Sequence, residues 1–235
     1  MENYNDVFQR TEQKYLLDSI QYQEIRRRLE GRAEVDRYGL STICNIYYDT
    51  PDFELIRRSL EKPRYKEKLR LRSYGIPKDR DPVFVEIKKK FNGVVYKRRI
   101  AMPFSQAEDY LNRGWRPDVC SQIMREINYF MAYYRPVPAV YLAYDRLACV
   151  GLENPEVRIT FDSSIRSRKQ ELDLSRGDYG DRVLAEGAYL MEVKIAGAMP
   201  LWLVDILSGM ELYPTSFSKY GSVYTQSICK AADIA

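Results

Sequence analysis

Basic side chains alternate along the segment "RYKEKLRLRSYG", residues 64–75. Lys66, Lys68, Arg70 and Arg72 occupy every second position there, and leucines lie between several of them. Because alternate residues of a β-strand point to opposite faces of the sheet, this spacing predicts a strand with one cationic face and one apolar face. Solvated protein faces usually mix charges of both signs. A row of like charges therefore raises the question of which ligand, if any, it binds.

Other segments with strand-like alternation repeat this arrangement. Glu86, Lys88 and Lys90 share one face of "VFVEIKKK", and Lys97 and Arg99 share one face of "VVYKRRIAM". The other polar faces carry Arg10, Glu12 and Lys14, then Arg146, then Arg158, Thr160 and Asp162, and finally Glu192 and Lys194. For any single strand, the solvated face of an antiparallel sheet is the simpler interpretation. The recurrence of Lys and Arg in a chain of net charge only +4 favours a common anionic ligand.

The helical segments also carry apolar residues, and these need a sheet surface to pack on. If the helices cover the apolar face from outside, the charged faces line the interior of a barrel. Such an interior is unfavourable when empty, because like charges repel one another and lose hydration. An extended phosphate chain would neutralise it, since Arg and Lys both bind phosphate oxygens well. We therefore predict a linear polyanion held in a tunnel.

Three acids lie on these otherwise basic faces, namely Glu12, Glu86 and Glu192. Each could pair with neighbouring cations. Each could instead hold Mg²⁺ or Mn²⁺, which prefer carboxylate oxygens and bridge to phosphate. We favour the metal-binding role for Glu192 and leave both roles open for Glu86 and Glu12.

The composition excludes several kinds of chemistry. The chain has no histidine, which rules out Ser-His-Asp and Cys-His nucleophilic schemes and histidine metal sites. Its four cysteines are scattered without a C-x-x-C pair, as in reduced cytosolic proteins. No apolar run approaches the roughly 18 residues of a membrane span, and the N-terminus lacks the apolar stretch of a signal peptide. We expect a cytoplasmic protein without a membrane span.

The periodicity predicts an α+β fold, an eight-stranded antiparallel β-barrel with helices packed outside, formed by a single domain over residues 1–235. The expected strands are 6–16, 41–49, 64–75, 82–90, 93–102, 137–150, 156–162 and 188–195. Helices are expected from Asp18 or Ser19 to Leu29, at a Ser105–Glu108 capping box, from Ser121 to before Pro136, near 200–210 and over 217–231. Residues 163–187 are expected to form a surface loop.

Seven segments in order, "KLRLRSYG", "VFVEIKKK", "VYKRRI", "YDR", "VRITFD", "LMEVKI" and "FSKYG", resemble the VTC-type polyphosphate polymerase domain. This domain belongs to the CYTH-like, triphosphate tunnel metalloenzyme superfamily, and the resemblance extends from Phe8 to about Tyr224. It implies a tunnel that binds triphosphate groups. It also implies transfer of the γ-phosphoryl group of ATP onto inorganic polyphosphate with Mn²⁺ or Mg²⁺. Separately, we expect no nucleic-acid partner, because the basic faces carry very few aromatic residues.

The resemblance also implies roles for individual residues. Those expected to act in catalysis are Arg70, Arg72, Arg146, Arg158 and Lys219. Matched phosphate-binding positions are Lys14, Lys88, Lys97, Arg99 and Ser218, to which the charged faces add Lys68, Lys90 and Lys194. Glu192 resembles the metal-binding glutamate, and Glu86 and Glu12 are the further metal candidates.

Two alternative functions remain at this stage. One is a triphosphatase of the same fold, but that branch has E-x-E-x-K where this chain has Arg10-x-Glu12-x-Lys14, which weakens the hydrolase interpretation. The other is a polyphosphate-binding module without turnover. An RNA-binding barrel is less favoured, because base stacking needs aromatic residues on the basic faces, and these faces carry very few.

Overall fold

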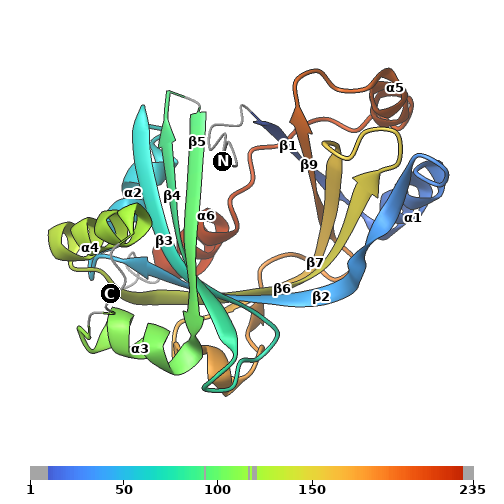
Figure 1. The fold of residues 1–235 in the computed structure, drawn as a ribbon. Helices are drawn as coiled ribbons and strands as arrows, with labels where there is room; N and C mark the ends of the chain where they lie inside the picture. The colour runs from blue at the N-terminus through green and yellow to red at the C-terminus, as the bar shows by residue number, and fades with distance from the viewer. Residues whose placement is uncertain (1–9, 93, 116, 118–120, 230–235) are drawn as a thin grey trace, which may run out of the picture. The chain divides into compact units, whose positions relative to one another are not determined.

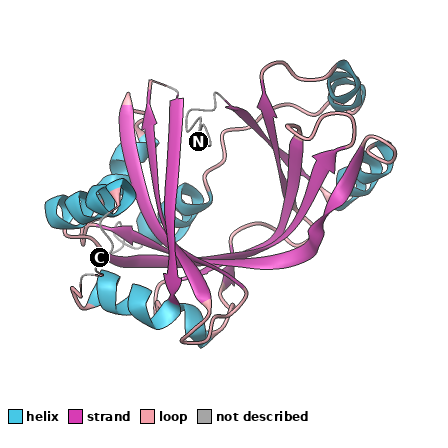
Figure 2. Ribbon diagram, in the orientation of Figure 1, coloured by secondary structure: helices cyan, strands magenta, loops and turns pink. Residues whose placement is uncertain are grey.

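The structure, a computed structural model, describes residues 10–92, 94–115, 117 and 121–229. Its strands are β1 (Arg10–Leu17), β2 (Ala33–Asp49), β3 (Tyr65–Tyr74), β4 (Pro82–Phe91), β5 (Val94–Pro103), β6 (Val137–Gly151), β7 (Arg158–Arg168), β8 (Asp181–Arg182) and β9 (Tyr189–Ala196). Its helices are α1 (Ser19–Arg28), α2 (Glu54–Leu60), α3 (Phe104–Asn112), α4 (Gln122–Tyr134), α5 (Leu201–Gly209) and α6 (Lys219–Val223). The expected α+β class is confirmed (Figure 2).

Eight long strands follow one another in the hydrogen-bonded order β1-β9-β7-β6-β2-β3-β4-β5, and the two-residue strand β8 pairs with β7. Pairs such as β1–β9 and β3–β4 are antiparallel. Each of the eight expected strand segments overlaps one of these long strands. The first four residues of the expected strand 6–16 lie outside the described residues.

The chain forms two compact units, and each is described by itself. The first unit comprises Met1–Ser41, Tyr144–Ile165 and Leu184–Phe217. The second unit comprises Thr42–Ala143, Arg166–Val183 and Ser218–Ala235. Strands β2 and β6 contribute residues to both units. The expectation of one functional domain over residues 1–235 stays a prediction.

Each unit has its own apolar core between a sheet face and helices. In the first unit, Phe161 of β7 and Val193 of β9 pack with Ile25 of α1 and Leu203 of α5. These side chains are almost fully buried. The helices therefore cover the apolar face of these strands, as the sequence predicted, and leave the charged face to other contacts.

The second unit follows the same rule. Leu69 of β3 and Val85 of β4 pack with Tyr110 of α3 and with Ile127 and Phe130 of α4. In Figure 1, β3, β4 and β5 lie side by side in this unit, with α3 and α4 beside them. Because the leucines and valines of these strands alternate with the charged residues, burial of the apolar side fixes the direction in which the charges point.

Two helix starts differ from the sequence analysis. Helix α2 was not predicted, and it begins after Phe53, whose backbone is left-handed (φ 62°) and whose side chain makes no capping bond. Helix α3 begins at Phe104, after Pro103, so the Ser105–Glu108 capping box is wrong. The side chain of Glu108 instead accepts a hydrogen bond from Asn112.

The segment 163–187 is more ordered than the expected surface loop. Strand β7 runs on to Arg168, whose side chain is buried. Its guanidinium group lies 3.5 Å from the centre of the Tyr141 ring and donates hydrogen bonds to the carbonyls of Gly177 and Tyr179, both at 3.0 Å. One arginine thus holds the following loop in place. The sequence pattern did not indicate this, because carbonyl groups carry no sequence signature.

The C-terminal helix also differs from the expected span 217–231. Helix α6 covers only Lys219–Val223, and a π-helical turn continues it over Tyr224–Cys229. Residues 230 and 231 lie outside the described residues. Within the described part of the chain, none of the helices is both long enough and apolar enough to cross a membrane.

We expect Ile127→Ala to lower the free energy of unfolding by about 2–5 kcal/mol, because it leaves a cavity in the second core. Ile127 has no exposed surface. Tyr129→Ala, on the same helix at a side chain that is 66% exposed, should change it by less than about 1 kcal/mol. Urea denaturation of both variants measures this, and equal losses would contradict the assigned packing of α4.

Candidate functional site

The charged face of the second unit is formed by β3, β4 and β5, and the strand register arranges it in rows. Arg70 lies opposite Glu86, and Glu86 lies opposite Arg99. In the next row Lys68 lies opposite Lys88, which lies opposite Lys97. The cations on this face are Lys66, Lys68, Arg70, Arg72, Lys88, Lys90, Lys97 and Arg99. Among the described residues of these strand faces, Glu86 is the one carboxylate set against these eight cations.

Glu86 is the centre of this face. Its side chain is 1% exposed, and its Oε2 accepts a hydrogen bond of 2.7 Å from Nε of Arg70. Oε1 lies 3.0 Å from Nζ of Lys97, and Oε2 lies 3.8 Å from Nε of Arg72. Burial by itself would raise the pKa of Glu86, but the charges of Arg70, Arg72 and Lys97 outweigh it and lower the pKa to about 2. Glu86 is therefore ionised at neutral pH.

The surroundings of Lys97 disfavour the charged form of its side chain. Burial and the positive charges of Arg70 and Arg72 lower the pKa of Lys97 to about 7, although Glu86 acts in the other direction. Its side chain still has 42% of its surface exposed. An anion bound beside this ammonium group would favour its charged form.

Neutral oxygens orient the two arginines. The Tyr47 hydroxyl accepts a hydrogen bond of 3.1 Å from Nη1 of Arg70, and Oδ1 of Asn45 accepts one of 2.9 Å from Nε of Arg72. Asn45 is itself buried and donates to the carbonyl of Leu142. The sequence analysis assigned no role to Asn45 or Tyr47. Asn45 and Tyr47 are two residues apart in "NIYY", within the expected strand 41–49, and residues at this spacing share a strand face. This spacing was the available signal that both lie on the same face.

The remaining cations of this face are spread along it. Lys68 donates to Oγ of Ser218 at 3.4 Å, and Lys66 donates to the carbonyl of Ser59 at 3.1 Å. The guanidinium group of Arg99 lies over the ring of Phe84. Ser218 caps α6 by accepting from the backbone N–H of Gly221. Lys88 and Lys90 occupy neighbouring positions on β4, and Lys219 is the first residue of α6.

The first unit carries a second charged face, on β1, β9 and β7. Lys14 lies opposite Glu192, which lies opposite Thr160, and in the next row Lys194 lies between Glu12 and Arg158. This face mixes carboxylates with cations, unlike the face of the second unit. It brings three of the predicted residues, Lys14, Lys194 and Arg146, close to Glu192.

Glu192 lies among cations and close to a second carboxylate, that of Glu12. Lys14 Nζ lies 3.8 Å from Oε1 of Glu192 and 3.4 Å from Oε1 of Glu12, so it stands between the two carboxylates. The Lys14 ammonium also donates to the carbonyl of Phe217 at 2.9 Å. Lys194 Nζ lies 3.1 Å from Oε2 of Glu192. Glu192 is only 6% exposed.

Arg146 is held by an acid that the sequence analysis noted on a polar face without assigning it a role. Asp162 is fully buried and accepts two hydrogen bonds from Arg146, from Nε at 2.6 Å and from Nη2 at 2.7 Å. The same Nη2 lies 3.6 Å from Oε2 of Glu192. A bidentate pair of this kind fixes the plane of the guanidinium group. Arg158 lies further along β7, opposite Lys194.

The residues around Glu192 fit a hard divalent cation. The Oγ1 atom of Thr160 is buried without a hydrogen-bond partner, and Thr160 faces Glu192 across the strand pair. With Glu12 nearby, these groups supply the oxygen donors that Mg²⁺ and Mn²⁺ prefer. No group of three Asp, Glu, Cys or His side chains is placed to hold a metal within the described residues. The cation would therefore need phosphate oxygens or water to complete its coordination.

Glu86 fits a metal less well. Like Glu192, it has three cations within 4 Å of its carboxylate. No second carboxylate joins it on the described charged face of β3, β4 and β5, so fewer oxygen donors are available to a metal ion there. Of the two roles left open for Glu86, the geometry favours ion pairing. Glu12, next to Lys14 and Glu192, fits either role.

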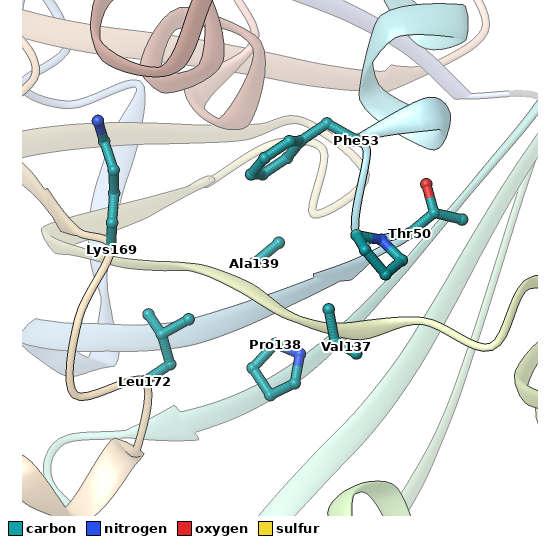
Figure 3. Close-up of a pocket in the computed structure, with 8 residues that line it drawn as sticks. Thr50, Phe53, Val137, Pro138, Ala139, Lys169 and Leu172 are labelled. Carbon is teal, nitrogen blue, oxygen red and sulfur yellow. The ribbon is translucent and has the colours of Figure 1, made fainter. Parts of the chain in front are cut away.

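A separate pocket of about 450 Å³ lies in the second unit (Figure 3). Its walls are mainly apolar and include Phe53, Pro138 and Leu172, with Lys169 at one side. None of the site residues predicted from the sequence lines it. The candidate site is therefore assigned to the charged strand faces.

Comparisons with known proteins agree with this fold. A family model, the VTC domain, matches residues 9–228 and so includes residues of both units. A comparison with curated proteins found no match.

Several solved structures share the fold at low sequence identity. A candidate adenylate cyclase from Bacillus halodurans aligns with a TM-score of 0.56 at 14% identity, covering 88% of this chain and 92% of that one. A candidate adenylate cyclase from Vibrio parahaemolyticus gives 0.52 at 12% identity, covering 93% and 99%. A candidate adenylyl cyclase from Hippeastrum, described as having a dominant triphosphatase activity, gives 0.54 at 15% identity, covering 91% and 94%. These likenesses confirm the expected fold class.

We expect Glu86→Gln to destabilise the free protein by about 3–5 kcal/mol, because it leaves the buried arginines without their counter-charge. Added tripolyphosphate should restore much of the loss, since it supplies negative charge to the same cations. Thermal denaturation with and without tripolyphosphate measures this. If the polyanion raises the midpoint of the variant no more than that of the wild type, Glu86 does not balance the charge of cations that the polyanion contacts.

The pKa of Lys97 gives a pH prediction with a definite sign. The folded value of about 7 lies below the ordinary 10.5, so Lys97 favours folding increasingly as pH rises from about 7 to 10.5. A bound polyanion should raise this pKa. Tripolyphosphate binding at pH 8 should therefore be accompanied by proton uptake, measured by calorimetry in buffers of different ionisation enthalpy. Lys97→Arg, which stays charged, should lose this uptake, and an unchanged uptake would exclude Lys97 as its source.

Proposed function

The chain belongs to the VTC domain family, and on this premise we propose that it is a polyphosphate polymerase. It would transfer the γ-phosphoryl group of ATP onto a polyphosphate chain. The observation that carries the proposal is the charged face of the second unit, where eight cations share a strand face with one buried carboxylate. Such an excess of positive charge is costly unless an anion of several charges binds to it.

Phosphoryl transfer depends mainly on positioning and on neutralising charge. Arg70 and Arg72 present planar guanidinium groups whose orientation is fixed by Tyr47 and Asn45. We assign to these arginines the γ-phosphate and the acceptor phosphate. Lys68, Lys88, Lys90, Lys97 and Arg99 would hold further phosphates of the chain, each as a point of positive charge.

The first unit carries the proposed metal-binding face. Glu192, with Thr160 and Glu12, would hold Mn²⁺ or Mg²⁺. When bound, that ion offsets the negative charge of phosphate oxygens. Arg146, held by Asp162, and Arg158, Lys14 and Lys194 would orient phosphate groups next to it. In the second unit, Lys219 and Ser218 would contact phosphate groups from the start of α6.

The reaction needs no general base. An ionised terminal oxygen of the acceptor chain attacks the γ-phosphorus, and the bond from that phosphorus to the β–γ bridging oxygen breaks. ADP leaves with the electron pair, and the chain is longer by one phosphate. No proton has to be removed from the acceptor, which agrees with a chain that contains no histidine.

A triphosphatase is the second candidate, because the similar Hippeastrum protein is described as having a dominant triphosphatase activity. Water would then replace the acceptor phosphate. The polymerase is preferred because Arg10 stands where the triphosphatase pattern has its first acid. We further propose that residues 1–235 act as one catalytic domain in the cytoplasm, with ATP and polyphosphate rather than nucleic acid as ligands.

We expect incubation with ATP and Mn²⁺ to give a ladder of polyphosphate on a gel. Orthophosphate as the sole product would contradict the polymerase and support the triphosphatase. Tight polyphosphate binding without any turnover would indicate a binding module.

Glu192→Gln should reduce metal-dependent turnover by at least about 100-fold, because its carboxylate is the principal metal ligand. Polyphosphate binding should persist, since the cations of the second unit remain. Glu153→Gln, at an exposed acid of the same unit, serves as the control and should leave turnover unchanged. Equal turnover in both variants would remove Glu192 from the metal site.

A further inference from the structure

A buried hydrogen bond ties the start of α6 to the end of β2. Asp49, the last residue of β2, is fully buried, and its Oδ2 accepts from the Tyr220 hydroxyl at 2.8 Å. Oδ1 accepts from the backbone N–H groups of Thr50 and Leu55, and Oδ2 also accepts from that of Ile56. One carboxylate thus organises the first turn of α2 and holds Tyr220 of α6 in the same place.

The ring of Tyr220 also contacts a residue that hydrogen-bonds to the charged face of the second unit. It stacks on Tyr47, with ring centres 4.9 Å apart and an angle of 24° between the planes. The Tyr47 hydroxyl in turn accepts from Arg70 at 3.1 Å. Tyr220 is 3% exposed, so neither contact competes with bulk water. A path of direct contacts therefore leads from α6 to the arginine nearest Glu86.

A second set of contacts fixes the same helix start. Oγ of Ser218 accepts from Lys68 of β3 at 3.4 Å and from the N–H of Gly221 at 3.2 Å. Gly221 approaches α2 so closely that an added Cβ would lie 3.1 Å from Cδ2 of Leu60. Helix α6 has only five residues, too few to be stable by propensity alone. Its position therefore depends on these contacts.

Lys219 lies between the two anchored residues, Ser218 and Tyr220. We propose that Tyr220 and Asp49 are positioning residues that set the place of Lys219 relative to Arg70, so that both cations contact one phosphate chain. This inference rests on the proposed function. Neither positioning residue touches the phosphates, and their effect on binding passes through Lys219.

Tyr220→Phe tests this directly, because it removes the hydroxyl bonded to Asp49 and keeps the ring that stacks on Tyr47. The matched control is Tyr110→Phe. Tyr110 is 4% exposed, and its hydroxyl donates to Oδ1 of Asn128 at 2.8 Å, also within the second unit. Both variants remove the hydroxyl of a buried tyrosine together with its hydrogen bond to another side chain, so a merely structural effect should be similar in the two.

The measurement is the affinity for tripolyphosphate, determined by calorimetry. We expect Tyr220→Phe to weaken binding about tenfold and Tyr110→Phe to leave it unchanged, because only the former displaces a phosphate contact. In the Lys219→Met background, Tyr220→Phe should cause no further loss. This absence of an added effect distinguishes positioning of Lys219 from general destabilisation.

Two results would overturn the inference. One is a Tyr220→Phe variant that binds tripolyphosphate as tightly as Tyr110→Phe. The other is a loss of the same size with and without Lys219. Failure of the proposed function would appear elsewhere, as a wild-type protein that makes no polyphosphate from ATP and Mn²⁺ although the two tyrosine variants still differ in tripolyphosphate binding.

Discussion

Repulsion among like charges is the constraint on which the second unit depends. Its strand register places eight cations on one face of β3, β4 and β5. Among the described residues of that face, Glu86 is the one acid. The carboxylate is ionised, buried and contacted by Arg70 and Lys97. Neutral oxygens of Tyr47 and Asn45 orient the arginines without cancelling their charge. The free protein therefore keeps a strong positive potential, which favours an anion with several charges.

The charged faces of the two units differ in composition. The first unit sets carboxylates among its cations, and Glu192 there has an orphaned hydroxyl, that of Thr160, opposite it. The second unit has cations in excess. Carboxylates suit a divalent metal ion, and cations suit phosphates. In each unit the helices pack on the apolar side of the strands, and the charged residues lie on the opposite side.

Local periodicity explains what the sequence could predict. Charged and apolar residues alternate along β3, β4 and β9, and this period alone identifies the strands and their two faces. Contacts between distant residues account for what it missed. Helix α2 starts after Phe53, whose backbone is left-handed, and a backbone N–H group of its first turn donates to the side chain of Asp49. The ion-pair role of Glu86 depends on which cations the register sets beside it, and the role of Asp162 depends on its contact with Arg146. Neither can be read from one strand alone.

A crystal structure of the protein with tripolyphosphate and Mn²⁺ tests the central claim most directly. We expect phosphate oxygens within hydrogen-bonding distance of Arg70, Arg72 and Lys97, and Mn²⁺ on the carboxylate of Glu192. Phosphate bound only to exposed lysines away from these strand faces, or charged faces buried under apolar side chains, would contradict it.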